Sequence, residues 1–345
     1  MDKGGLRQGR WLWLGLLIAT PVIFLLCVGV GSVAISPAET AHALWGALTG
    51  TLSTSVGTET ASILLKVRLP RVCSVALVGA ALSLCGGAMQ GLLKNPLADG
   101  STLGVSAGAS LGAVLAIAFG VRLPFLSGAG VTVLSILFAF LSMFLILSLA
   151  HALDYSLSTN TIILVGVIFS MFASSVTSLL VTFAGDKVKN IMFWTMGSFA
   201  GASFSDAGLM LLALLVCGFV LLRLAPELNA FAVGEENARH VGVDVRRVKL
   251  TVMVATSVLL GVAVSVSGSI GFVGLVIPHM TRFVTGPNHR RLLPASMWAG
   301  GLFLLLADLL SRTLFSPAQL PIGVITSFVG SLAFIYIFYT LRRKG

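Results

Sequence analysis

The sequence predicts an all-α polytopic membrane protein with about ten transmembrane helices in one bundle. Of its 345 residues, 57% are hydrophobic and only 10% are charged, whereas soluble domains carry about 25% charged residues. Apolar runs of about 17–25 residues, long enough to cross a bilayer as a helix, recur along the whole chain. Membrane-spanning helices pack into one bundle, so we expect a single transmembrane domain, 1–345.

Local signals delimit the expected helices. The first apolar run begins with WLWLGLLIATPV and exceeds the core of a signal peptide, about 7–15 residues, so an uncleaved helix is expected. The second stops before Asn95-Pro96, because the residue before a proline avoids the α region. In the third, Gly108 and Gly112 have the spacing of closely packed helices. The ten expected spans are 11–33, 71–90, 102–120, 129–149, 160–184, 205–223, 249–267, 271–284, 293–311 and 320–341.

The distribution of basic residues predicts the orientation. Membrane proteins carry an excess of Lys and Arg on the cytoplasmic side. With both termini in the cytoplasm, the outer side holds only 7 of the 22 basic residues, so the net charge of +10 reflects topology and not affinity for nucleic acid. These seven are Lys66, Arg68, Arg71, Arg122, Lys187, Lys189 and Arg312.

Two long polar segments and one short turn interrupt the apolar pattern. Residues 34–67 are expected to form the longest outer loop, and residues 225–248, which contain helix formers, short amphipathic helices on the cytoplasmic face. The turn 94–99 lies at the inner end of the second helix. Non-helical backbone at a membrane is tolerated where it is buried in protein or lines water, so this turn is either a constriction of a pathway or an ordinary connection.

Signatures of catalysis are weak or missing. Gly104-Val105-Ser106-Ala107-Gly108 matches the G-x-S-x-G nucleophile motif, which needs a strand-to-helix turn; here it opens an apolar helix, which favours helix packing. The sequence contains no H-E-x-x-H and no G-x-x-x-x-G-K-[ST], so we expect a non-enzymatic chain that binds no ATP through a P-loop. The cysteines lie in apolar spans without C-x-x-C spacing and are expected to be packing residues: Cys27, Cys73, Cys85 and Cys217.

Five polar residues in or near the spans have two interpretations each. His279 is either a proton relay or a polar contact inside a helix. Asp308 and Arg312, four residues apart, form either a structural or a functional pair. Arg68 and Arg71 at the outer side either reach toward lipid headgroups or, with Arg312, present guanidinium groups to carboxylates of a soluble partner.

Several motifs in combination resemble the permease family of type II ABC importers, which take up ferric siderophores, haem and cobalamin. They lie in order between about residues 60 and 340: RLPRV, GGAMQGLLKNPLADGSTLGVSAGA, WTMGS, LNAFAVGEENARHVGVD, GSIGFVGLVIPHMTRFVTGPNHRRLLP, ADLLSRTL and LPIGVIT. The resemblance implies a ten-helix subunit in the bacterial cytoplasmic (inner) membrane. It implies a second permease copy, two ATPase subunits inside and an extracytoplasmic substrate-binding protein outside.

The resemblance also implies roles for individual residues. It implies that the binding protein docks on Arg68, Arg71 and Arg312. Asn95 and Leu97 match an inner gate, and Ser158 and Thr159 match a second constriction. Coupling to the ATPase is implied for Gly234, Glu235, Glu236, Asn237, Ala238, Arg239 and Gly242. We expect no cofactor or metal on this chain, with ATP-Mg on the partner subunits.

Two departures from the family pattern concern prolines. The last helix carries Gly330-Ser331-Leu332-Ala333-Phe334 where the family has G-A-P-x-F, so a straighter final helix is expected. Asp99-Gly100 replaces an acid-Pro pair.

The expected function is translocation of an iron chelate, haem or cobalamin by alternating access. The alternatives are a secondary transporter driven by an ion gradient, with Asp308 or His279 as the coupling residue, and an intramembrane hydrolase that uses Ser106.

Overall fold

The computed structural model describes residues 3–31, 35–49, 58–121, 123, 129–155 and 158–342. Arg122, which the topology counts on the outer side, lies outside the described residues. Each of the ten expected spans overlaps one helix, which confirms the all-α fold class. These helices are α1 (Lys3–Gly29), α4 (Leu69–Leu93), α5 (Val105–Phe119), α6 (Gly130–Leu153), α7 (Thr159–Phe183), α9 (Phe204–Arg223), α12 (Val245–Ser267), α13 (Val273–Thr285), α14 (His289–Thr313) and α15 (Ile322–Arg342).

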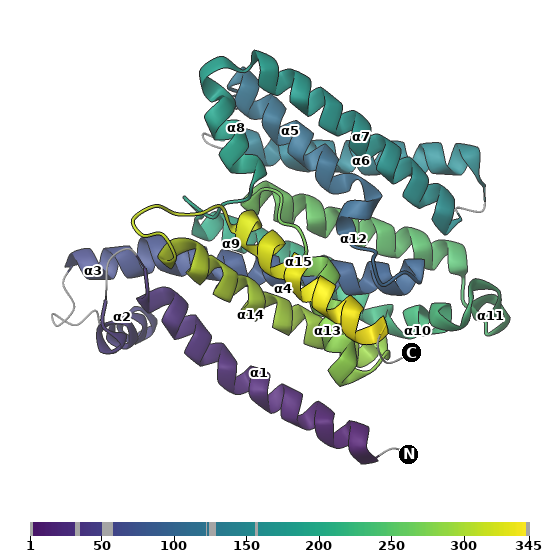
Figure 1. Ribbon diagram of the computed structural model, residues 1–345, viewed down its shortest axis with the longest axis horizontal. Helices are drawn as coiled ribbons and strands as arrows, with labels where there is room; N and C mark the ends of the chain where they lie inside the picture. The colour runs from purple at the N-terminus through teal and green to yellow at the C-terminus, as the bar shows by residue number, and fades with distance from the viewer. Residues whose placement is uncertain are drawn as a thin grey trace.

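Shorter helices lie at the two ends of the bundle. Both chain termini lie at one end, which we call the terminal end, together with α10 (Ala225–Val233) and α11 (Glu235–His240), as Figure 1 shows. The helices α2 (Pro37–Thr49), α3 (Thr58–Ser62) and α8 (Val188–Thr195) lie at the opposite end. The short helices expected within 225–248 are therefore present. Single turns complete the list: η1 (Ile63–Arg68), η2 (Gly100–Leu103) and η3 (Gly185–Lys187).

Helix α4 forms the centre of the bundle. It contacts α9, α12, α13 and α14, and its apolar window is 83% buried, compared with 22% to 28% for α6, α7 and α9. These outer helices expose large apolar side chains such as Phe144 and Phe219. Water disfavours such a surface but lipid does not. Six helices in the described part of the chain are long and apolar enough to cross a membrane.

Glycines allow the central helices to approach each other closely. A Cβ atom at Gly86 of α4 would overlap the backbone carbonyl of Gly274 in α13, and one at Gly79 would overlap that of Gly300 in α14. Backbone contacts of this kind are typical of membrane helices, where packing takes the place of the hydrophobic effect between helices. These glycines thus set how near α13 and α14 lie to α4.

A proline inside α13 is compensated by a side chain of α4. Pro278 has no N–H group, so the carbonyl of Gly274, four residues earlier, loses its helical donor. The Nε2 atom of Gln90 donates to this carbonyl at 3.4 Å and to that of Leu275 at 3.0 Å. The Oε1 atom of Gln90 accepts a hydrogen bond from Arg282 at 3.2 Å. Gln90 therefore joins α4 to the interrupted turn of α13.

The expected start of the second span, and the expected outer loop 34–67, were wrong. A continuous helical run extends from Glu59 to Leu93, and α2 occupies much of the preceding segment. The span was expected to begin at residue 71, but Pro70 lies in α4 just after the turn η1 and does not end the helical run. The π-helical turn η1 joins α3 to α4 without a break.

Candidate functional site

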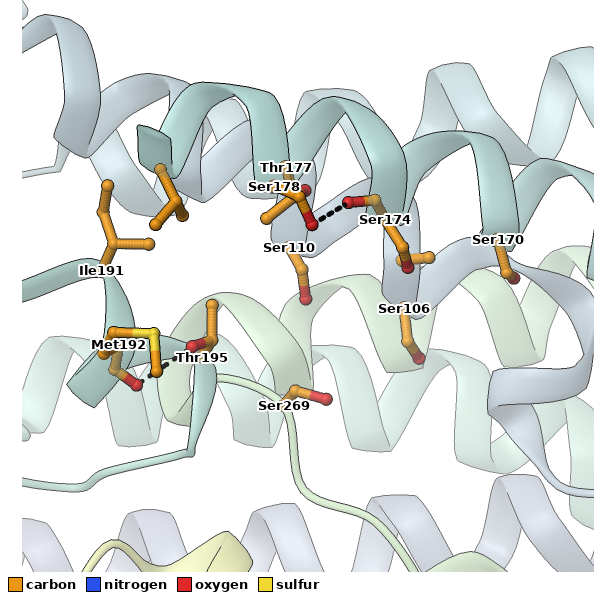
Figure 2. A pocket seen from close by; sticks show the side chains of 12 residues that line it. Ser106, Ser110, Ser170, Ser174, Thr177, Ser178, Ile191, Met192, Thr195 and Ser269 are labelled. Atoms are coloured by element: carbon orange, nitrogen blue, oxygen red, sulfur yellow. Dashed lines mark hydrogen bonds between the residues drawn. The ribbon is translucent and has the colours of Figure 1, made fainter. Parts of the chain in front are cut away.

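A cavity of about 660 Å³ lies between α5, α7, α8 and the segment that follows α12. Figure 2 shows its side chains, which surround one common space. Eight lining residues carry hydroxyl groups, and we call this space the hydroxyl-lined cavity: Ser106, Ser110, Ser170, Ser174, Thr177, Ser178, Thr195 and Ser269. The other lining residues are Ala107, Val181, Ile191 and Met192. The lining thus combines many hydroxyl groups with apolar surface and contains no charged side chain.

Five of these hydroxyl groups are free to bind a ligand or water. Three others donate within their own helices: Ser170 to the carbonyl of Gly166, Ser178 to that of Ser174, and Thr195 to that of Met192, at 2.8–3.0 Å. Within the described chain, no hydrogen bond engages the hydroxyls of Ser106, Ser110, Ser174, Thr177 and Ser269. A polar group that enters the cavity can therefore be met without breaking internal bonds.

Two glycine turns position the end of the cavity near α8. Gly197 and Gly268 have φ angles of +79° and +69°, which L-residues rarely adopt. The carbonyls of Gly197 and Met196 accept hydrogen bonds from the first N–H groups of α15, and the N–H of Ser198 donates to the last residue of α12 at 2.9 Å. The WTMGS segment thereby connects α8, α12 and α15, and it places Thr195 and Ser269 on the same cavity.

This cavity was not predicted from the sequence, although the sequence contains a signal for it. Ser170, Ser174, Thr177 and Ser178 recur at the i, i+4, i+7, i+8 spacing of one helix face. Ser106 was expected to belong to a helix-packing motif, with a nucleophile as the alternative. The 12 lining residues include no histidine, aspartate or glutamate, so the cavity lacks the partners that a serine nucleophile needs.

The glycines that follow Ser106 are packing residues, as expected. A Cβ atom at Gly108 would overlap Ser142 of α6, and one at Gly112 would overlap the carbonyl of Leu134 in the same helix. These contacts confirm the interpretation of this segment as a packing motif between α5 and α6.

The expected inner gate is a tight turn at the terminal end. Lys94 ends α4 in the left-handed conformation, with φ +49°. The Oδ1 atom of Asn95 accepts a hydrogen bond from the N–H of Leu97 at 2.9 Å, and its carbonyl accepts one from Ala98 at 3.0 Å. Leu97 is 55% exposed. The turn is internally bonded and presents an apolar side chain outward.

The expected second constriction is the N-terminus of α7. Ser158 caps this helix by accepting a hydrogen bond from the N–H of Thr161 at 3.4 Å. Asp154 accepts the N–H of Ser158 at 3.0 Å, and Thr159 is the first helical residue. Both this cap and the Asn95 turn lie at the terminal end (Figure 1). Among the described residues, no hydrogen bond connects the two.

Two of the three expected docking arginines lie inside the protein. Arg68 donates to the carbonyls of Gly29 and, at 3.0 Å, Val28. Arg312 donates to the carbonyls of Val30 and Cys27 at 2.8 and 2.9 Å. Each arginine is only 6% exposed. They satisfy the carbonyls that end α1, which have no helical partners, so their guanidinium groups do not face outward as the sequence analysis expected.

The third arginine, Arg71, borders open space. Its Nε and Nη2 atoms lie 3.0 and 2.8 Å from one carboxylate oxygen of Asp308, which is fully buried. Its Nη1 atom donates to Gln319 at 2.9 Å. Arg71 also lines a cavity of about 300 Å³ with residues of the segments 198–200 and 319–322. This cavity lies near the start of α15.

The segment 225–248 has an attached side and an exposed side. Gly234, with φ +127°, joins α10 to α11. Glu235 binds the buried Lys249 of α12 at 2.8 Å, and Ala238 is buried. The remaining residues expected to couple to an ATPase are exposed: Glu236, Asn237, Arg239 and Gly242. An arriving protein can therefore meet both charges, Glu236 and Arg239.

The final helix is unbroken, as the missing proline led us to expect. Helix α15 runs from Ile322 to Arg342 without interruption. Gly330 lies so close to Phe272 that an added Cβ atom would approach the phenylalanine Cβ to 2.5 Å. This segment of α15 therefore packs against the turn before α13.

Comparisons with known proteins place this geometry among membrane permeases. A family model described as the FecCD transport family matches residues 17–340. The chain is 46% identical to YvrB, an ABC transporter permease protein of Bacillus subtilis, over 82% of this chain and 80% of that protein. It is 39% identical to the cobalamin import system permease protein BtuC of Halobacterium salinarum, over 81% of this chain and 74% of that protein.

Two further matches cover nearly the whole chain. The molybdate import system permease protein MolB of Haemophilus influenzae is 34% identical, over 96% of this chain and 95% of that protein. A solved structure described as an inward-facing conformation of a metal-chelate type ABC transporter has a TM-score of 0.83 at 32% identity. It covers 96% of this chain and 99% of that chain.

Proposed function

The chain belongs to the FecCD transport family, and we propose that it carries an iron chelate, haem or cobalamin through the bacterial cytoplasmic membrane. Its general class is the permease subunit of an ABC importer. The cargo, the pairing with a second copy and the orientation are parts of the proposal. The observation that supports this proposal is the hydroxyl-lined cavity in a chain of the ABC permease class.

The cavity supports a bulky polar cargo. Its volume of about 660 Å³ lies within the range of sites for organic ligands, roughly 300–1,000 Å³. Hydroxyl groups can donate or accept hydrogen bonds, so they meet the amide, hydroxamate or carboxylate groups of a chelate without binding one of them strongly. Ser174 and Ser178 are exposed, so the cavity opens at the protein surface, where a second copy can complete a pathway.

The two ends of the bundle suit different partners. We assign the terminal end to the cytoplasm, where the exposed Glu236 and Arg239 offer charges to an ATPase subunit. The opposite end faces a substrate-binding protein. There, of the three expected arginines, Arg71 is the one that lines an open cavity, so we assign carboxylate docking chiefly to Arg71. Alternating access then opens the pathway first to one end and then to the other, driven by ATP on the partner subunits.

Both candidate coupling residues of the ion-driven alternative are engaged in contacts inside the protein. Asp308 is fully buried and held by two guanidinium groups, Arg71 at 2.8 Å and Arg312 at 2.9 Å, so both of its carboxylate oxygens are engaged in ion pairs. His279 packs edge-on against Phe283 with ring centroids 5.2 Å apart. These contacts suit a structural role for both residues, so we favour the ATP-driven importer.

Uptake into liposomes tests the function. The chain is reconstituted alone and with its ATPase subunits and binding protein, and uptake of a ferric chelate, haem or cobalamin is measured with and without ATP. We expect uptake only from the complete complex with ATP. Glu236→Lys combined with Arg239→Glu is expected to reduce co-purification of the ATPase, because both side chains are exposed. Uptake by the chain alone on an ion gradient would contradict the proposal.

A further inference from the structure

Helix α10 is fastened to the start of α14 by one asparagine. The Oδ1 atom of Asn229 accepts a hydrogen bond from the N–H of His289 at 2.8 Å and lies 2.9 Å from its Nδ1 atom. The Nδ2 atom of Asn229 donates to Asn288 at 3.0 Å. Since this amide oxygen can only accept, the Nδ1 atom of His289 carries the proton. The ring is thereby held in one orientation.

The other side of the imidazole ring lies against α4. His289 is 3% exposed, and its Nε2 atom has no hydrogen-bond partner among the described residues. A Cβ atom at Gly91 would overlap this Nε2 atom and would lie 3.0 Å from Cδ2. No side chain larger than hydrogen fits at position 91 while the ring stays in place. His289 therefore connects α10 to α4 with hydrogen bonds on one side and direct packing on the other.

The contact at Gly91 lies one helical turn before the turn of Asn95 and Leu97, which we call the gate turn. Helix α4 ends at Leu93, and the hydrogen-bonded turn of Asn95 and Leu97 follows directly. A short, internally bonded connection transmits the position of a helix end better than a flexible one. The adjacent Gln90 is tied to α13, so this end of α4 is supported from two sides.

The segment 225–248 has a second attachment, which joins it to α12. Helix α11 is bound to α12 through Glu235 and Lys249. This ion pair does not involve α4 or the gate turn. A displacement of α10 and α11 by an ATPase thus reaches α12 by one route and α4 by another.

We propose that His289 is a positioning residue that carries the movement of α10 to the Asn95–Leu97 turn. This role rests on the proposed function, since it requires an ATPase that moves α10. We assign it to the packed ring because His289 is bonded to Asn229 of α10 on one side and lies against Gly91 of α4 on the other, where α10 and α4 also contact each other directly. The gate then opens when the imidazole shifts with α10 and releases or displaces the end of α4.

Two substitutions remove, one at a time, the two contacts of His289: the packing against α4 and the hydrogen bonds to α10. His289→Asn keeps an amide near the position of Nδ1 that can still bond to Asn229, but it loses the ring atoms that reach Gly91. Asn229→Ala keeps the ring against Gly91 but removes its bonds to α10. The matched control is Asn190→Ala, which changes an exposed asparagine of α8 at the opposite end.

The measurement is cargo transported per ATP hydrolysed in the reconstituted complex. We expect both variants to hydrolyse ATP and to co-purify with the ATPase as the wild type does. Their ratio of cargo to ATP should fall about tenfold, within the usual range of coupling between separate sites, and Asn190→Ala should leave it unchanged. An unchanged ratio in both variants, or an equal fall in ATP hydrolysis and uptake, would overturn the role of His289.

A second readout does not depend on cargo. A Leu97→Cys substitution places a thiol on the exposed gate residue, and its rate of maleimide labelling is measured in the assembled complex with and without ATP. ATP should change this rate in the parent but not in His289→Asn or Asn229→Ala. If the wild-type complex imports nothing, the proposed function is wrong. The labelling rates still test whether His289 links α10 to the gate turn. Equal ATP-dependent changes in all three proteins would refute it.

Discussion

The Nε atom of Arg312 lies 2.9 Å from the Oδ2 atom of Asp308, one helical turn earlier in α14, and both side chains are buried. Arg71 of α4 binds the other carboxylate oxygen of Asp308 at 2.8 Å. Arg312 also donates to two carbonyls at the end of α1. One carboxylate therefore orients the guanidinium groups that join α1, α4 and α14 at the opposite end of the bundle.

Removal of this carboxylate should destabilise the bundle. Asp308→Ala leaves the buried guanidinium group of Arg312 and the partly buried one of Arg71 without their counter-charge, and breaking a buried ion pair typically costs about 3–5 kcal/mol. Thermal unfolding in detergent, followed with a thiol-reactive dye that reaches the cysteines on unfolding, should show a clear decrease in Tm. As a control, Asp206→Ala removes an exposed capping carboxylate of α9 and should cost only about 1 kcal/mol. Equal shifts in the two variants would show that the buried group adds nothing.

Gln90 and Pro278 should be coupled energetically. Gln90→Leu removes a donor to the carbonyls that the proline turn exposes, and a buried carbonyl without a partner costs about 1–3 kcal/mol. In a Pro278→Ala background, the new N–H can bond to Gly274, so the loss of Gln90 should cost less. A double-mutant cycle of Tm values measures this coupling. Strictly additive shifts would contradict the assigned role of Gln90.

Close packing of α4 on α13 predicts a strong effect of one methyl group. Gly86→Ala would drive a Cβ atom into the carbonyl of Gly274, and we expect a cost at the upper end of the ~1–3 kcal/mol for overpacking. The matched change Gly208→Ala on α9 meets no atom within 4 Å and should stabilise that helix by roughly 1 kcal/mol. Yield of folded protein and Tm check both. A tolerated Gly86→Ala would mean that the two helices separate easily.

Blocking the hydroxyl-lined cavity should stop cargo but not ATP hydrolysis. Ser174→Trp places an indole ring in the cavity, so we expect uptake to fall about tenfold or more while the complex still assembles. Ser175→Trp is the control, because Ser175 is exposed, does not line the cavity and bonds to the carbonyl of Met171. Uptake assays in liposomes separate the two. Similar uptake by both variants would indicate that cargo passes elsewhere.

The helices themselves were predictable because their signals are local. Apolar runs, Asn95-Pro96 and the polar segment 225–248 located all ten long helices and the short α10 and α11. The expected start of the second span at residue 71 was wrong because the helical run begins earlier, at Glu59, in a polar segment that was expected to be a loop. The family resemblance is confirmed by the match over residues 17–340, whereas the roles of single residues stay predictions.

The sequence by itself determined where the main helices lie and that the chain resembles a permease family, because hydropathy and motif order are properties of short stretches of chain. Only the tertiary structure decided that Arg68 and Arg312 face inward to the end of α1. It also brought serines from α5, α7 and residue 269 around one cavity. The physical reason is that helix rotation and neighbour choice depend on packing among segments far apart in sequence, where a single Cβ atom at Gly86 or Gly91 would change the arrangement.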